Sequence, residues 1–205
     1  MHGRFRPEWV AGLSRNLQLK QATDIPTLFK VIKNWSKYSK SFKVVGFTED
    51  SVINKLTGLA SGYRVIPKDI KNILIQYCKS TDTNVQKIAM QCMEGKWNQA
   101  NLPTLEKIRC KSNRPQMLKL QAMVEKKSKG ALTLAKKYRN DRDPYVRNTA
   151  IEALGEIGGR NELGWLNSQV NISLKTGIDK YDPAKIVEAT VKIKERLGIS
   201  IHKKN

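Results

Sequence analysis

Apolar residues recur at intervals of three and four along almost the whole chain, and they rarely alternate with polar residues. This spacing gathers them on one face of an α-helix, whereas a half-buried strand needs strict alternation. We therefore expect helices over approximate residues 7–19, 24–41, 48–62, 67–80, 82–93, 101–110, 113–124, 129–139, 143–158, 161–172 and 182–197. The pattern predicts an all-α protein.

The second half of the chain carries a repeated unit. Asp82 and Asp143 are each followed at offsets +3, +7 and +11 by apolar residues, with alanine at +7, and weaker copies begin at Asn113 and Asp182. The side chain of an Asp or Asn accepts a hydrogen bond from a free N–H at a helix start, and the three offsets share one helical face. A second short helix completes each unit. A period of 30–40 residues with two helices predicts an α-solenoid of stacked antiparallel helix pairs.

One copy also resembles a known family. The motif is Asp143-Pro144-x-Val146-Arg147-x-x-Ala150-x-x-Ala153-Leu154-Gly155-x-Ile157-Gly158. It resembles the second helix of HEAT-like repeats, and the resemblance covers about half the chain. It implies that Asp143 caps its helix or binds the next repeat, and that Arg147 braces a neighbouring unit. The copy at Asp182 departs from the pattern because Lys185 stands where an apolar residue is expected, which suits a terminal cap with a polar outer face.

These patterns predict three regions. Residues 1–66 form an N-terminal basic helical segment, residues 67–198 form HEAT-like helical repeats, and residues 199–205 form a basic tail.

Charge then narrows the class of partner. The chain has 38 Lys and Arg against 18 Asp and Glu, a formal net charge of +20. Such an excess is typical of proteins that bind polyanions, above all nucleic acid. Three clusters are the candidate nucleic-acid-binding residues: Lys30, Lys33, Lys37, Lys40 and Lys43; Lys107, Arg109, Lys111 and Arg114; and Lys126, Lys127, Lys129, Lys136, Lys137, Arg139 and Arg142.

The leading hypothesis is a non-catalytic protein that binds the phosphate backbone, with RNA favoured over DNA. We expect such a protein in an RNA–protein particle, for example a cytoplasmic or mitochondrial ribosome. Protein subunits of the same particle would be further partners. Three widely spaced cysteines favour reduced thiols inside the cell. No apolar run is long enough to span a bilayer, so no membrane partner is expected.

Catalytic motifs are missing from the sequence. There is no nucleotide-binding glycine motif and no nucleophile elbow, and both histidines, His2 and His202, lie near the ends. No cofactor and no metal site are expected.

Two alternatives stay open. One is a protein-interaction scaffold for an acidic partner. The other is a DNA glycosylase similar to known HEAT-like glycosylases. Those enzymes have Trp and Asp side chains in a cleft, and Trp97, Asp143 and Trp165 are residues of these types.

Overall fold

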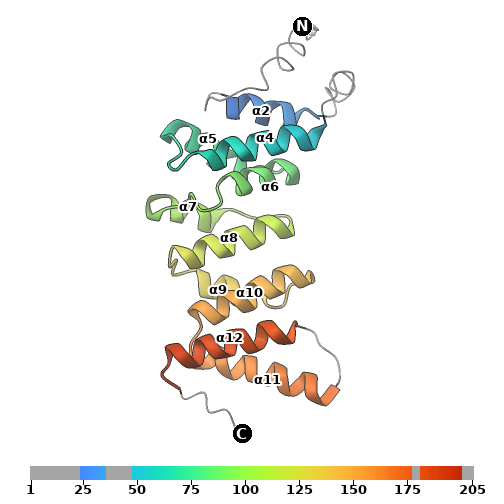
Figure 1. Cartoon of the computed structure of the whole chain (residues 1–205), viewed down its shortest axis with the longest axis vertical. Coiled ribbons are helices and arrows are strands. Elements are labelled where there is room, and N and C mark those ends of the chain that lie inside the picture. The colour runs from blue at the N-terminus through green and yellow to red at the C-terminus, as the bar shows by residue number, and fades with distance from the viewer. Residues whose placement is uncertain (1–23, 36–47, 177–180, 200–205) are drawn as a thin grey trace, which may run out of the picture. The chain divides into compact units, whose positions relative to one another are not determined.

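A computed structural model describes residues 24–35, 48–176 and 181–199. Within those ranges the regular structure is entirely helical, which confirms the all-α prediction (Figure 1). The helices are α2 (Asp24–Lys33), α4 (Glu49–Gly62), α5 (Lys68–Cys78), α6 (Thr83–Cys92), α7 (Leu102–Lys107), α8 (Asn113–Glu125), α9 (Ala131–Tyr138), α10 (Pro144–Ile157), α11 (Arg160–Thr176) and α12 (Pro183–Arg196), with a 3₁₀ turn at Gln99–Asn101. The helix predicted over residues 7–19 and the end of that predicted over 24–41 lie outside the described residues.

Three of the four predicted aspartate or asparagine caps are confirmed. Asp82, Asp143 and Asp182 each precede a helix, and each accepts at 2.9 Å from the backbone N–H two residues further on. Asn113 is instead the first residue of α8, and Ser112 before it makes no side-chain cap bond. The Asn113 amide donates to the Asp143 carboxylate, so it joins the starts of α8 and α10.

The contacts divide the chain into two compact units, Met1–Lys96 and Trp97–Asn205. The boundary expected at residues 66/67 falls inside the first unit, between α4 and α5. In that unit α2 packs on α4, and α6 packs on both α4 and α5. Phe29 stacks on Tyr77 with ring centroids 4.3 Å apart, and Leu56, Leu74 and Ile88 are fully buried. Apolar faces at helical spacing therefore build this core, as the sequence predicts.

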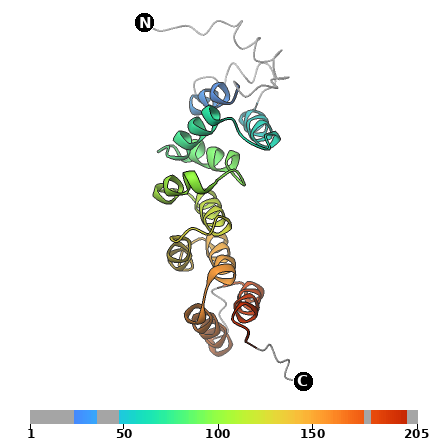
Figure 2. The same ribbon diagram turned by 90° about the vertical axis from the view of Figure 1, so that its left-hand side faces the viewer.

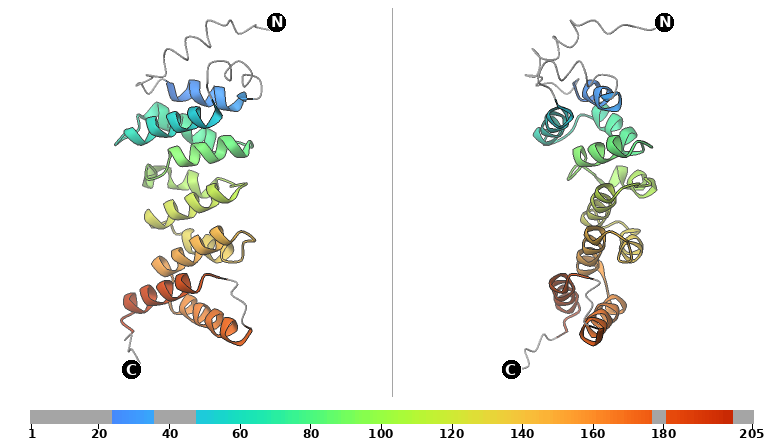
Figure 3. Two further views of the ribbon diagram at one scale, coloured as in Figure 1. Left: turned by 45° about the vertical axis from the view of Figure 1, so that its right-hand side comes forward. Right: turned by 90° about the vertical axis from the view of Figure 1, so that its right-hand side faces the viewer.

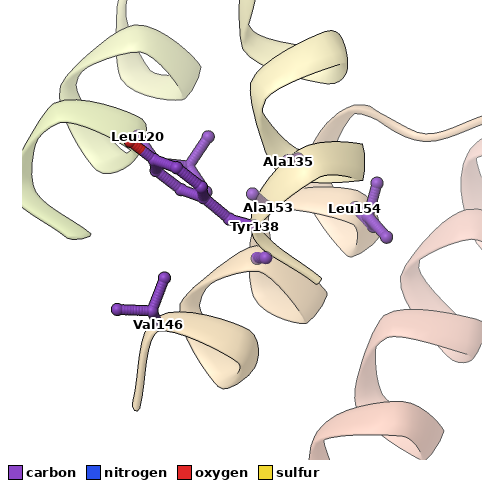
Figure 4. Close-up of a cluster of buried hydrophobic side chains, with 7 residues drawn as sticks. Leu120, Ala135, Tyr138, Val146, Ala153 and Leu154 are labelled. Carbon is purple, nitrogen blue, oxygen red and sulfur yellow. The ribbon is translucent and has the colours of Figure 1, made fainter. Parts of the chain in front are cut away.

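In the second unit, α8, α10 and α12 pack in succession, while α9 contacts α8 and α10, and α11 contacts α12. Figures 2 and 3 show α7, α9 and α11 lying to one side of the layer made by α8, α10 and α12. A cluster around Tyr138 joins α8, α9 and α10 (Figure 4). Its members are Leu120, Ala135, Tyr138, Val146, Ala150, Ala153 and Leu154. The residues at offsets +3, +7 and +11 from Asp143 are thus all buried in one core.

Helices α10 and α12 approach closely through two small residues. A Cβ atom placed on Gly155 would lie 2.9 Å from the Cα atom of Ala189, which is closer than real Cβ atoms come to backbone. Ala189 stands at offset +7 from Asp182, and its small side chain allows the close approach. Glycine at position 155 therefore sets the distance between α10 and α12.

Two arginines donate hydrogen bonds to backbone carbonyl groups at the two ends of α10. Arg196 of α12 donates to the carbonyl oxygens of Gly155 at 2.8 Å and Glu156 at 2.6 Å, and also to that of Gly158. These carbonyls end α10 and have no partner within the helix. Arg147 donates to the carbonyls of Asp141 and Arg142 in the loop before its own helix. These hydrogen bonds of Arg147 are thus local, and its expected role in bracing a neighbouring unit stays a prediction.

Candidate nucleic-acid interface

A cleft of about 830 Å³ opens in the second unit, between the segment that follows α7 and the end of α9 with its loop to α10. Five basic residues line it: Lys107, Arg109, Lys119, Lys137 and Arg142. Lys107 and Arg109 belong to one predicted cluster, and Lys137 and Arg142 belong to another. The fold thus brings together cations that are about 30 residues apart in the sequence.

Lys119 fixes one wall of this cleft. Although it is a lysine, it is only 6% exposed. It lies on α8 between two leucines. Its ammonium group donates to the carbonyl oxygens of Glu106 at 2.7 Å and Ile108 at 2.8 Å, where α7 ends. Burial lowers the pKa of Lys119, while the nearby Cys110 and Glu106 act in the opposite direction. Lys119 therefore holds the chain that presents Lys107 and Arg109.

The two carboxylates in the cleft are engaged in local structure. Glu106 accepts a hydrogen bond from the Ser128 hydroxyl, and Asp141 accepts from the backbone N–H of Asp143 at 3.0 Å. Lys107, Lys137 and Arg142 are exposed, and none forms an ion pair with any residue in the described part of the chain. With five cations and only two carboxylates, the cleft keeps an excess of positive charge.

The thiol of Cys110 and the phenol of Tyr138 on the cleft wall add no negative charge at neutral pH. Burial raises the pKa of the Cys110 thiol to about 11, against the opposing effect of Lys119. Burial also raises the pKa of the Tyr138 phenol, and Cys110 and Asp141 raise it further. Both groups stay protonated at pH 7, and a protonated thiol is a poor nucleophile. The cleft is suited to binding an anion.

Several other predicted cations have partners within the second unit. Lys126 pairs with Glu125, Lys136 pairs with Glu162 at 2.7 Å, and the Arg139 guanidinium lies 4.2 Å from the centre of the Trp165 ring. These contacts engage the three cations within the fold, so they are less available to a ligand than the cations of the cleft.

The remaining predicted cations lie outside the cleft. Lys111, Arg114 and Lys129 are exposed but do not line it, and Lys127 lines a different groove. Lys30 and Lys33 are exposed on α2 in the first unit. Lys37, Lys40 and Lys43 lie outside the described residues. The structure thus gathers four of the sixteen predicted residues at the cleft.

The groove that Lys127 lines has a different electrostatic character. It measures about 550 Å³ and lies on α8, α10 and α12, where it is lined by Glu125, Glu152, Glu156 and Glu188 together with Lys127 and Lys192. Lys192 pairs with Glu156 at 2.8 Å and Glu188 at 3.0 Å. Lys185, the residue that replaces an apolar one in the last copy, pairs with Glu152 at 2.6 Å. Opposite charges are matched here, unlike in the cleft.

The three residues of the glycosylase alternative lie elsewhere. Trp97 is buried, and Trp165 packs edge-on against Tyr181 with centroids 5.4 Å apart. Asp143 caps α10 and binds Asn113. None of the three lines the cleft.

Sequence reasoning missed Lys119. The sequence did contain a signal, since this lysine is flanked by Leu118 and Leu120 in an apolar stretch. A lysine is rarely buried unless its charge has partners, so such a position indicates a lysine with a structural role.

In the described ranges no group of three or more His, Cys, Asp or Glu side chains is arranged to hold a metal ion. No helix found there has the length and apolar character needed to cross a membrane.

Comparisons of this chain with protein-family models, with curated proteins and with solved structures find no match.

Proposed function

We propose that this protein is a non-catalytic, basic helical-repeat protein that binds nucleic acid, with RNA favoured, through the phosphate backbone. The observation that carries the proposal is the convergence of Lys107, Lys137 and Arg142 on one cleft without carboxylate partners in the described part of the chain. Arginine and lysine side chains placed in this way bind phosphate oxygens without reading base sequence.

The proposed architecture is a HEAT-like α-solenoid of stacked antiparallel helix pairs. Three features of the second unit support it. Aspartate-capped helices recur along it, α8, α10 and α12 pack in succession, and Asn113 binds Asp143 of the next copy. Each helix pair then buries its apolar face only against its neighbours, as in other repeat proteins. We place this protein in an RNA–protein particle in the cytoplasm or mitochondrion.

Salt dependence gives the proposal a quantitative form. Each cation that neutralises a phosphate releases a counterion, so log affinity falls with log salt by about 0.7 per contact on a single strand and about 0.9 on duplex DNA. Removing three phosphate contacts should therefore reduce the slope by about two to three.

The test compares two triple variants that lose the same charge. K107Q/K137Q/R142Q removes cations from the cleft, whereas K68Q/K79Q/R160Q removes three exposed cations outside it. Fluorescence anisotropy with a labelled RNA from 50 to 200 mM salt should show weaker binding and a smaller slope for the first variant. The second variant should stay close to the wild type. Equal losses in the two variants would reject the cleft as the site.

An acidic protein partner would use the same cations, so a second assay separates it. Under the proposal, proteins captured with the tagged chain from a cell extract leave when nuclease is added. A specific protein that remains bound after nuclease treatment would favour the scaffold instead.

A further inference from the structure

An exposed aromatic ring lies close in sequence to the cleft. Tyr145 is 71% exposed, and no other aromatic residue in the described ranges falls in the exposed class. It is the second residue of α10, three positions after Arg142, which lines the cleft. Three residues span at most about 11 Å, so the Cα atom of Tyr145 stays within that distance of the Cα atom of Arg142.

The connection between the two residues is held in place by several hydrogen bonds. Asp143 accepts from the backbone N–H of Tyr145 at 2.9 Å, and its own N–H donates to Asp141. Arg147 donates to the carbonyl oxygens of Asp141 and Arg142 at 3.0 and 2.9 Å. Pro144 further restricts the backbone at the helix start. A ligand therefore meets a cation and a ring whose backbones are already ordered, which lowers the entropy cost of binding.

An aromatic platform beside a row of cations is the arrangement that binds unpaired nucleotides. The cations follow the phosphates, and each exposed ring takes the face of a base. In a duplex the base faces are stacked on one another, so Tyr145 would have no face to contact. Unpaired bases can be splayed out and stacked on a tyrosine.

We infer that the cleft, as the phosphate-binding site of the proposed function, takes single-stranded nucleic acid, with one unpaired base stacked on Tyr145. Lys107, Lys137 and Arg142 bind phosphates of the same strand. The inference rests on the proposed function and adds the strandedness of the ligand and a residue that contacts a base.

The experiment uses the full chain with a single strand and a duplex of the same sequence. Y145A and Y145L should bind the single strand about 5- to 150-fold more weakly, the range for loss of one stacked base. Y145F keeps the ring and should bind like the wild type. Neither the salt slope nor duplex affinity should change, because no phosphate contact is removed. Circular dichroism of each variant verifies the fold, which an exposed side chain should not disturb.

A fluorescent base gives a second measure. A strand containing 2-aminopurine should show a change in emission on binding the wild type and Y145F, and a smaller change on binding Y145A.

The possible outcomes separate this inference from the proposed function. Equal binding of single strand and duplex, or no loss in Y145A, overturns the inference, and the proposed function stands if K107Q/K137Q/R142Q still loses affinity. Equal losses in the cleft variant and its charge-matched control overturn both.

Discussion

Replacing Gly155 with alanine tests the close packing of α10 on α12. The added Cβ atom would lie 2.9 Å from the Cα atom and 3.1 Å from the Cβ atom of Ala189. Because one of these atoms is backbone, the helices must move apart, and overpacking of this kind costs about 1–3 kcal/mol. Alanine also favours the helix by about 1 kcal/mol over glycine. The net change should be a loss of up to about 2 kcal/mol of unfolding free energy.

Gly164 provides a matched control. It lies within α11, and a Cβ atom placed there meets nothing within 4 Å. G164A should therefore show only the helix gain of up to about 1 kcal/mol. Urea unfolding followed by circular dichroism measures both variants, and the difference between them isolates the packing cost of about 1–3 kcal/mol. If G155A proves as stabilising as G164A, the proposed contact between α10 and α12 is refuted.

Three further side chains give separate predictions. Burial raises the pKa of Glu162, but the hydrogen bonds from Lys136 and from the Gly159 N–H lower it more, so the net pKa lies below 4.5. In urea unfolding at pH 7, the unfolding free energy of the wild type should exceed that of E162Q by about 1 kcal/mol. This difference should vanish as the pH falls through the lowered pKa of Glu162. A constant difference down to pH 3 would contradict the prediction. The pKa of Cys110 is raised from 9.0 to about 11, so at pH 8 it has about 100-fold less thiolate than an unperturbed cysteine. Mass spectrometry should therefore show correspondingly slow alkylation of Cys110 by iodoacetamide. A rate in the native protein equal to the rate in urea would disprove this. R196Q should lose about 1–2 kcal/mol of unfolding free energy, because the last carbonyls of α10 lose their donor. R196K should lose less than R196Q but remain below the wild type. An unchanged urea midpoint in R196Q would argue against this role of Arg196.

Local chemistry explains why the helices could be predicted so closely. An aspartate that caps a helix, such as Asp143, binds N–H groups two and three residues away, so the signal is complete within a short segment. The same holds for Thr48, where a helix start is expected and where Thr48 and Ser51 form a reciprocal cap. Asn113 was placed at a cap position by spacing alone, and there the partner is Asp143, 30 residues further on. Spacing could not reveal a contact that depends on how two copies pack.

The cleft could be predicted only in part for the same reason. Sequence clusters identified Lys107 and Lys137 as binding candidates, but the clusters do not show which cations meet. Lys136, next to Lys137, pairs with Glu162, a residue 26 positions away. Tertiary packing thus places Lys136 in an ion pair and its neighbour Lys137 in the cleft. Tyr145 gave no sequence signal, because tyrosine is intermediate between the buried and the exposed residue types, and its 71% exposure is set by packing.

Lysine footprinting tests the central claim most directly. The protein is treated with an amine-acetylating reagent in the presence and absence of a saturating single-stranded RNA, and mass spectrometry measures the extent of modification at each lysine. We predict that RNA protects Lys107 and Lys137 in the cleft and leaves the exposed Lys68 unchanged. Equal modification of Lys107 and Lys137 with and without RNA would contradict the account.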